Sequence, residues 1–196
     1  MTSFHLNINN LSKSYGELQV LKKLNLTLAS GQTYCLMGAS GSGKTTLLRI
    51  VLGLEQPDSG TISLSPKPAD RLVAVFQDNR LCETFSALDN VSLAAGRTYS
   101  QRDIYQELLR LLPEESILRP VSTLSGGMKR RVAIVRAVLA PSCGILMDEP
   151  FTGLDDDTRQ TVINYIKEKT TGKLLVVSTH QEEDVAALGG TLLRLF

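Results

Sequence analysis

The segment Gly38-Ala-Ser-Gly-Ser-Gly-Lys44-Thr45 is the feature that most limits how this 196-residue chain can fold. It joins a short apolar run, Tyr34–Met37, to a stretch with helical periodicity that begins at Thr45. A buried strand is therefore predicted to pass through a glycine-rich turn directly into a helix. Strand, tight loop and helix in this order, repeated later in the chain, predict an α/β fold with a mostly parallel sheet.

The loop has the spacing of a phosphate-binding loop: a glycine, four residues, then Gly-Lys-Thr. Its glycines let successive backbone N–H groups point inward at phosphate oxygens, and the following helix adds the positive end of its dipole. Lys44 is then expected to reach the β- and γ-phosphates and Thr45 to bind Mg²⁺. Taken alone, this loop indicates a nucleoside triphosphate and leaves kinases, GTPases and motors open. The predicted phosphate contacts are Gly38, Ser40, Gly41, Ser42, Gly43, Lys44, Thr45 and Thr46.

Two kinds of apolar pattern predict two kinds of strand. Alternation at period two predicts half-buried antiparallel strands, and it occurs at Phe4, Leu6 and Ile8, at Leu24, Leu26 and Leu28, and at Thr61–Leu64. Continuous apolar runs are typical of parallel strands covered on both faces, and they occur at Tyr34–Met37, Leu72–Phe76, Ile145–Met147, Leu174–Val177 and Leu192–Phe196. Helical patterns cover Thr45–Leu52, Asp103–Leu112, Met128–Leu139, Asp155–Glu168 and Gln181–Leu188.

The length of the chain predicts one domain, at about 150 residues per domain. Residues 78–123 break the alternation of strands and helices, because their pattern is helix or loop with Pro113 and Pro120 between. We interpret this segment as an inserted helical subdomain within a single domain of residues 1–196.

Charge and cysteine content exclude several classes of protein. With 21 basic and 20 acidic residues the formal net charge is +1, which removes bulk electrostatics as a route to nucleic acid or to a membrane surface. The sequence has no run of about 18 apolar residues, so no membrane span is predicted. Its first residues lack the pattern of a secretory signal. Cys35, Cys82 and Cys143 are too few and too far apart for a disulfide framework, and we expect buried thiols in a reducing compartment.

Two carboxylates follow the buried run Ile145–Met147. Asp148, at the carboxyl end of the predicted strand, is placed to bind Mg²⁺ through water. Glu149 points elsewhere and is the candidate general base for an attacking water. The alternative is a solvated acidic strand end.

Three further features have an ordinary structural explanation beside a functional one. Ser125-Gly126-Gly127 precedes a helix and is explained as an N-cap with loop glycines, or as a set of exposed donors for an anion. His180 follows the strand Leu174–Val177, where a single histidine is usually structural. The simplest explanation of a basic cluster on the helix after Ser125 is a solvated face, and a partner-facing or phosphate-adjacent role is the alternative; the cluster comprises Lys129, Arg130, Arg131 and Arg136.

Together, and in this order, these residues resemble the ATP-binding cassette (ABC) family of ATPases over nearly the whole chain. The matching motifs are the adenine-stacking Tyr15, the Walker A loop Gly38–Thr45, the Q-loop Gln77, the signature Leu124–Gly127, the Walker B strand Ile145–Glu149, the D-loop Gly153–Asp155 and the switch His180. The resemblance implies a P-loop NTPase core with a mostly parallel sheet, an N-terminal antiparallel β-subdomain and an inserted α-helical subdomain.

The resemblance also implies roles for the residues that match. It implies that ATP and Mg²⁺ are bound and that catalysis uses Lys44, Gln77, Glu149 and His180. It assigns the metal to Thr45, Gln77 and Asp148, and further nucleotide contacts to Tyr15, Ser125, Gly126, Gly127 and Asp155. Two positions depart from the family pattern, because Met128 and Arg130 stand where family members commonly carry glutamine.

The biology that the resemblance implies is that of a transporter motor. Two copies are expected to form an ATP-induced homodimer, head to tail, and to act on a separate transmembrane permease and through it on a solute-binding protein, with no nucleic acid involved. The expected location is cytoplasmic, peripheral on the inner face of the cell membrane. The stretch from Val75 to Val91 is similar to importer subunits for small anions. A soluble non-transport ABC ATPase and an ATP-sensing interaction module are the alternatives.

Overall fold

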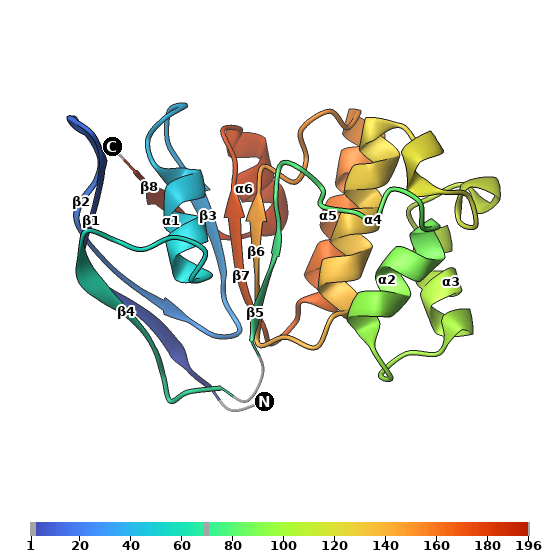
Figure 1. The fold of residues 1–196 in the computed structure, drawn as a ribbon, viewed down its shortest axis with the longest axis horizontal. Coiled ribbons are helices and arrows are strands. Elements are labelled where there is room, and N and C mark those ends of the chain that lie inside the picture. The colour runs from blue at the N-terminus through green and yellow to red at the C-terminus, as the bar shows by residue number, and fades with distance from the viewer. Residues whose placement is uncertain (1–2, 69–70, 196) are drawn as a thin grey trace. The chain divides into compact units, whose positions relative to one another are not determined.

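The computed structural model describes residues 3–68 and 71–195 and divides the chain into two compact units. The first unit comprises Met1–Ala74, Ser142–Glu149 and Thr171–Phe196, and the second comprises Val75–Pro141 and Pro150–Thr170. The second unit contains residues 78–123 together with two further helices. The boundaries of an inserted helical subdomain therefore stay a prediction. Figure 1 traces the chain.

An antiparallel sheet forms one part of the first unit. Its strands, in the order β2-β1-β4, are β1 (His5–Tyr15), β2 (Leu18–Ala29) and β4 (Ser59–Ser65). Leu6 and Ile8 are buried, as their alternation predicts. The alternation is lost after Ile8 because the register of β1 shifts between Ile8 and Leu11, where Asn10 adopts a left-handed backbone with φ of 48°.

A second sheet contains the strands predicted from continuous apolar runs. Its order is β5-β6-β7-β3-β8, and its strands are β3 (Thr33–Met37), β5 (Leu72–Val75), β6 (Gly144–Asp148), β7 (Leu174–Ser178) and β8 (Thr191–Arg194). β3 pairs in parallel with β7 and β8, and β6 pairs in parallel with β7. Every residue of β6 and β7 is buried, which confirms the interpretation of their apolar runs. Helices α1 (Lys44–Val51) and α6 (Glu182–Leu188) follow β3 and β7.

The topology of this sheet determines where functional residues gather. In a parallel sheet the carboxyl ends of neighbouring strands meet at one edge, where ligands bind. The glycine-rich loop leaves β3 at that edge, Glu149 follows β6, and His180 follows β7. The terminal strand was predicted to reach Phe196, which lies outside the described residues.

The second unit is helical. It contains α2 (Ala87–Ala95), α3 (Gln101–Leu109), α4 (Gly126–Leu139), α5 (Asp156–Lys169) and two short 3₁₀ turns at Glu114–Ser116 and Val121–Thr123. Within this unit α4 packs against α2, α3 and α5 (Figure 1). The predicted buried stripe of Val132, Val135 and Leu139 is buried, and so are residues on other sides of α4, because the helix has neighbours on several faces.

Two expectations from composition have different outcomes. Cys35 and Cys143 are buried, but Cys82 is exposed, so the expectation of buried thiols is wrong for Cys82. Burial raises the pKa of the Cys35 thiol to about 11, so it stays protonated at neutral pH. None of the helices in the described ranges is both long enough and apolar enough to span a bilayer.

Candidate active site

The glycine-rich loop between β3 and α1 has the backbone that its sequence predicts. Gly41 and Gly43 have φ of 82° and 90°, in the left-handed region that favours glycine. A Cβ on Gly38 would lie 2.3 Å from Ser42 Oγ, and one on Gly43 would lie 2.8 Å from Val20 Cγ1. Larger residues therefore do not fit at these positions, and Gly43 caps α1 without any side-chain hydrogen bond to the first N–H groups. Those N–H groups face the loop as donors for an anion.

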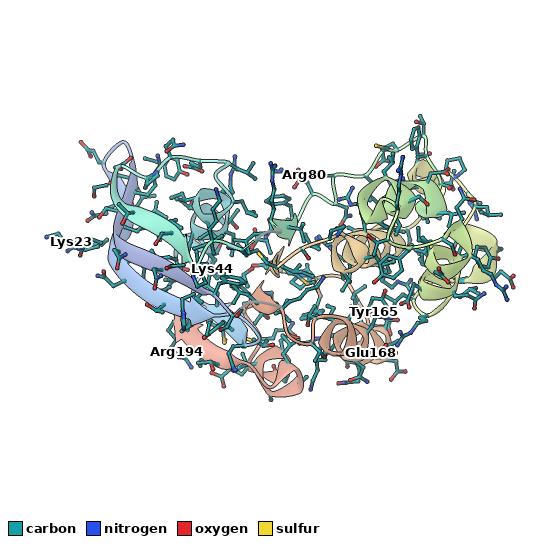
Figure 2. The ribbon with its side chains drawn as sticks, turned by 90° about the horizontal axis from the view of Figure 1, so that it is seen from below. Lys23, Lys44, Arg80, Tyr165, Glu168 and Arg194 are labelled. Atoms are coloured by element: carbon teal, nitrogen blue, oxygen red, sulfur yellow. The ribbon has the colours of Figure 1, made fainter. Side chains whose placement is uncertain are left out.

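The lysine of the loop is folded over it. Lys44 lies at the start of α1 (Figure 2), is only 7% exposed, and its Nζ donates to the carbonyls of Gly38 at 2.7 Å and Ala39 at 3.0 Å. Within the described residues, the buried Oγ of Ser42 has no hydrogen-bond partner. A buried hydroxyl without a partner is costly unless a ligand satisfies it, and a phosphate oxygen is the acceptor that this cradle suits.

The residues beside the loop fit a magnesium ion that the phosphates help to hold. Thr45 Oγ1 donates to Asp148 Oδ2 at 2.6 Å, which leaves lone pairs of the threonine oxygen for a cation. Asp148 is 2% exposed, and its Oδ1 accepts from Ser178 Oγ at 2.6 Å. Among residues 3–68 and 71–195, no group of three or more His, Cys, Asp or Glu is placed to hold a metal. A hydroxyl and one carboxylate beside a phosphate cradle are the ligand set of Mg²⁺ bound with its substrate.

Glu149 is held in an unusual backbone conformation directly after β6. Its φ of 47° lies in the left-handed region, where the backbone of a residue other than glycine is strained. Residues strained in this way are concentrated at functional sites. Its N–H donates to both the carbonyl and the Oγ of Ser178, at 3.2 and 2.9 Å, and these bonds stabilise that conformation. The roles of Glu149 as the base and of Asp148 as a metal ligand stay predictions.

His180 lies next to Glu149 on a fixed loop. Its Nδ1 is 3.8 Å from Glu149 Oε1, and its side chain is 58% exposed against 22% for Glu149. Thr179 N–H donates to the Leu36 carbonyl at 3.1 Å, Thr179 Oγ1 donates to the buried Asp184, and Gln181 N–H donates to Thr179 Oγ1 at 3.1 Å. The backbone on both sides of His180 is therefore anchored while the imidazole faces solvent.

Tyr15, the predicted adenine contact, ends β1 in the same unit. It is 49% exposed, its hydroxyl donates to Glu55, and Lys13 Nζ lies 5.5 Å from its ring centroid. This exposure leaves ring surface for stacking, so the adenine role stays a prediction that the geometry permits.

The remaining predicted site residues belong to the second unit. Gln77 is exposed just after β5. Ser125 caps α4, because its side chain accepts from Met128 N–H at 3.2 Å, and Gly126 has open space where a Cβ would lie. A Cβ on Gly127 would meet Leu154 Cδ2 at 3.4 Å, so the signature and the D-loop are neighbours within this unit.

Asp155 of the D-loop has a clear structural role. It caps α5 by accepting from Thr158 N–H at 2.9 Å, and this hydrogen bond lowers the pKa of the Asp155 carboxyl. A nucleotide contact for Asp155 stays a prediction, as does a joint site of Gln77 and Ser125–Gly127 with the phosphate loop.

The expectation that the basic cluster on α4 is a solvated face is wrong. Arg130 is only 8% exposed and donates to the carbonyls of Phe76 and Gln77. Arg131 donates to the Leu111 carbonyl at 2.6 Å, and Arg136 donates to loop carbonyls as well. These guanidinium groups hold loops in place, which a helical pattern on its own does not reveal.

Sequence reasoning missed several residues that support the site. Ser178 contacts both Asp148 and Glu149, and Thr179 with Asp184 anchors the His180 loop. These contacts join residues from different strands or a strand and a helix. The only local signal was the polar pair Ser178-Thr179 at the end of an apolar run.

Comparisons with known proteins agree with this geometry. Residues 21–152 match the family model described as ABC transporter. The chain is 36% identical to the aliphatic sulfonates import ATP-binding protein SsuB of Corynebacterium glutamicum, over 96% of this chain and 79% of that protein. It is 35% identical to the sulfate/thiosulfate import ATP-binding protein CysA 2 of Rhizobium meliloti, over 92% of this chain and 54% of that protein.

A solved structure agrees over almost the whole chain. It is a dimeric, post-hydrolysis state of the ATP-binding cassette MJ0796 bound to ADP and Pi, with a TM-score of 0.85 and 29% identity over 97% of this chain and 94% of that one. In this chain, one edge of the parallel sheet carries the phosphate cradle, the Thr45–Asp148 pair and the neighbouring Glu149 and His180. The chain therefore belongs to the ABC transporter family: it is an ATP-binding cassette, which binds ATP with Mg²⁺ and hydrolyses ATP.

Proposed function

We propose that this ATPase powers a membrane transporter and that two copies close head to tail around two Mg-ATP. The observation that carries the proposal is the cluster at the sheet edge, where Thr45 donates to Asp148 and Glu149 lies beside His180. This cluster offers side chains for phosphate, for Mg²⁺ and for a general base, all from the first unit. In the proposal, Ser125–Gly127 of a second copy completes it, in a self-complementary interface.

Phosphoryl transfer to water depends mainly on positioning and on neutralising charge. Lys44 and the loop N–H groups hold the phosphates, and bound Mg²⁺ supplies further positive charge, held by Thr45 and Asp148. Glu149 orients and deprotonates the attacking water, and His180 steadies the γ-phosphate. Gln77 is assigned to the metal and the attacking water only by the family resemblance.

Replacing Glu149 by glutamine tests the assignment of the base. Glu149→Gln keeps the size and position of the side chain but removes its capacity to take a proton. We expect ATP binding to persist and steady-state hydrolysis to fall by about 100-fold or more, the range for losing a general base. Glu182→Gln is the matched control, because Glu182 is 72% exposed and pairs with Arg194. Unchanged hydrolysis in Glu149→Gln would remove Glu149 as the base.

The membrane partner in this proposal is a separate permease that receives a solute from a solute-binding protein. The support is that relatives 35–36% identical are import ATP-binding proteins for sulfonates and for sulfate or thiosulfate. By analogy we propose import of a small oxyanion and a peripheral position on the inner face of the membrane. The helical unit also exposes apolar surface suited to a partner: Phe85 and Leu93 are 43% and 65% exposed and line a hollow of about 390 Å³ with Asp89 and Ser92.

Capture of the partner is a direct test of this proposal. Glu149→Gln protein with ATP is used to pull down partners from detergent-solubilised membranes, with and without Phe85→Ala and Leu93→Ala. We expect a multi-span protein to be recovered, and its recovery to fall with the Phe85 and Leu93 changes. Leu18→Ala is the control, because Leu18 is 66% exposed on β2. Recovery of ribosomes or nucleic acid alone would favour a soluble non-transport ATPase and overturn the transporter proposal.

A further inference from the structure

The segment of residues 76–80, here called the Gln77 segment, has a defined conformation in the second unit. Arg80 has a left-handed φ of 50°, and its guanidinium carbon lies 3.7 Å from the ring centroid of Phe76. Arg80 also donates from Nε to the Asp78 carboxylate at 3.2 Å. The Gln77 side chain is exposed on this compact turn.

Arg130 of α4 holds the two peptide planes on either side of Gln77. Its Nη1 donates to the Phe76 carbonyl at 2.5 Å and its Nη2 to the Gln77 carbonyl at 2.6 Å. A residue has only two soft backbone dihedrals, so restraining the peptide plane before and after Gln77 fixes its φ and ψ. The direction of the Gln77 Cα–Cβ bond is thereby fixed as well.

Arg136 holds the other end of the same segment. Its Nη1 donates to the Arg80 carbonyl at 2.6 Å and its Nη2 to the Asn79 carbonyl at 2.8 Å. Two arginines on one helix therefore bind four carbonyls within five residues. A guanidinium suits this task because its donors form a rigid fork, and charge-assisted hydrogen bonds are about twice as strong as neutral ones.

The helix that carries both arginines begins at the Ser-Gly-Gly loop. Ser125 caps α4, and Arg130 lies five positions further along, in the second turn of a 14-residue helix. A helix moves as a stiff rod over this length, so displacement of its N-terminus is passed to the Gln77 segment. The contact is between residues of one unit.

We propose that Arg130 is a positioning residue for the ATPase reaction: it fixes the backbone of Gln77, and thus the direction of the Gln77 side chain, and couples that direction to the signature end of α4. We call the pair of hydrogen bonds from Arg130 to the Phe76 and Gln77 carbonyls the clamp. Its role in catalysis rests on the proposed contact of Gln77 with metal and water. Arg136 secures the far end of the segment.

Amide hydrogen exchange tests the clamp itself. Arg130→Gln removes the charged fork, and we expect amides of residues 76–80 to exchange about tenfold faster, since the segment opens more often. Lys129→Gln is the matched control: it removes the same charge from the adjacent position, where Lys129 pairs with Glu83 at 2.8 Å. Equal exchange in Arg130→Gln and wild type, or an equal increase in Lys129→Gln, overturns the clamp.

A double-mutant cycle tests whether Arg130 acts through Gln77. We expect Arg130→Gln to lower kcat about tenfold, the factor typical of losing a hydrogen bond to a charged group, while KM for ATP stays within about twofold. In a Gln77→Ala background the same change is expected to have no further effect on kcat. Equal fold losses in both backgrounds would show that Arg130 acts independently of Gln77 and would overturn the proposal.

Arg130→Lys tests the clamp if the Arg130→Gln protein does not fold. Arg130→Lys keeps the charge, but its single nitrogen cannot bridge both carbonyls in the arginine geometry, so we expect exchange and kcat between those of wild type and Arg130→Gln. Wild-type values for Arg130→Lys in both measurements contradict the clamp. A wrong assignment of Gln77 can be told apart from a wrong clamp. If Gln77 has no contact with metal or water, Gln77→Ala leaves kcat unchanged, while the hydrogen-exchange comparison still tests the clamp.

Discussion

One small hydroxyl contacts both acidic residues of the candidate active site, the carboxylate of Asp148 and the backbone N–H of Glu149. Ser178 is fully buried, its Oγ donates to Asp148 Oδ1 at 2.6 Å, and the same Oγ accepts from Glu149 N–H at 2.9 Å. The first bond orients a metal ligand, and the second stabilises the left-handed backbone of the candidate base. A single residue on β7 thus helps to set the geometry of the last residue of β6 and of the residue after it.

Replacing Ser178 by alanine is expected to damage stability and catalysis together. Asp148 is a buried carboxylate, so losing one of its hydrogen bonds is expected to lower the free energy of unfolding by about 1–3 kcal/mol. We also expect kcat to fall about tenfold or more as Glu149 loses its anchor. Urea unfolding and steady-state ATPase assays measure the two effects. Ser63→Ala on β4, where the side chain is exposed, is expected to change neither.

At the residue scale, the sequence predicts the groups that carry local signatures. The phosphate loop, Asp148, Glu149 and His180 follow strands that are visible as apolar runs, so their places at the sheet edge can be inferred. Ser178 and Arg130 cannot be found in this way. Their partners lie 30 and 53–54 positions away along the chain, and the contacts depend on strand register and helix rotation. A basic helix face looks the same in sequence whether it meets solvent or backbone carbonyls.

At the scale of elements, α3 and α5 are joined by a network of charges around a buried tyrosine. Arg110 forms a two-point contact with Glu168, at 3.0 and 2.6 Å, and lies 4.8 Å from the ring centroid of Tyr165 (Figure 2 labels both Tyr165 and Glu168). Lys169 pairs with Glu107 at 2.6 Å. Burial raises the pKa of the Tyr165 hydroxyl, so the ring stays neutral under the charges.

This network predicts how acid affects the helical unit. The hydrogen bond from Arg110 lowers the pKa of Glu168 from 4.5 to about 2. Because the folded pKa lies below the unfolded one, the stabilisation is complete above about pH 4.5 and is lost as the pH falls through about 2. Glu168→Gln should therefore narrow the difference in urea midpoint between pH 6 and pH 3. An unchanged difference would show that the pair does not contribute.

The elements that sequence predicts best are those with an unbroken pattern. The sequence predicts the parallel strands and helices α1, α3, α4, α5 and α6 to within a few residues of the ends that the structure describes. Helix α2 was not predicted as an element, although Ser86 and Asp89 form a capping box at its start, because its nine residues sit within a segment of mixed helix and loop pattern. The second half of β1 was also missed, since the register shifts beyond Ile8 destroy the alternation.

At the scale of the whole molecule, the predicted functional residues are shared between two units. The phosphate loop, Asp148, Glu149 and His180 belong to the first unit, whereas Gln77, Ser125–Gly127 and Asp155 belong to the second. The α/β class and the two kinds of sheet follow from the sequence. The strand order β5-β6-β7-β3-β8 does not, because it depends on crossover connections that no local pattern encodes. In the proposed dimer, Ser125–Gly127 in the second unit of each copy complete the site that the first unit of the other copy forms.

Sedimentation velocity of Glu149→Gln protein tests that central claim most directly. With Mg-ATP we expect the species to have the mass of two chains, and with Mg-ADP the mass of one. Adding Ser125→Glu is expected to keep ATP binding but abolish the dimer, because a carboxylate would face the γ-phosphate of the other copy. A Glu149→Gln protein that binds ATP tightly yet sediments as a single chain at every concentration would contradict the account.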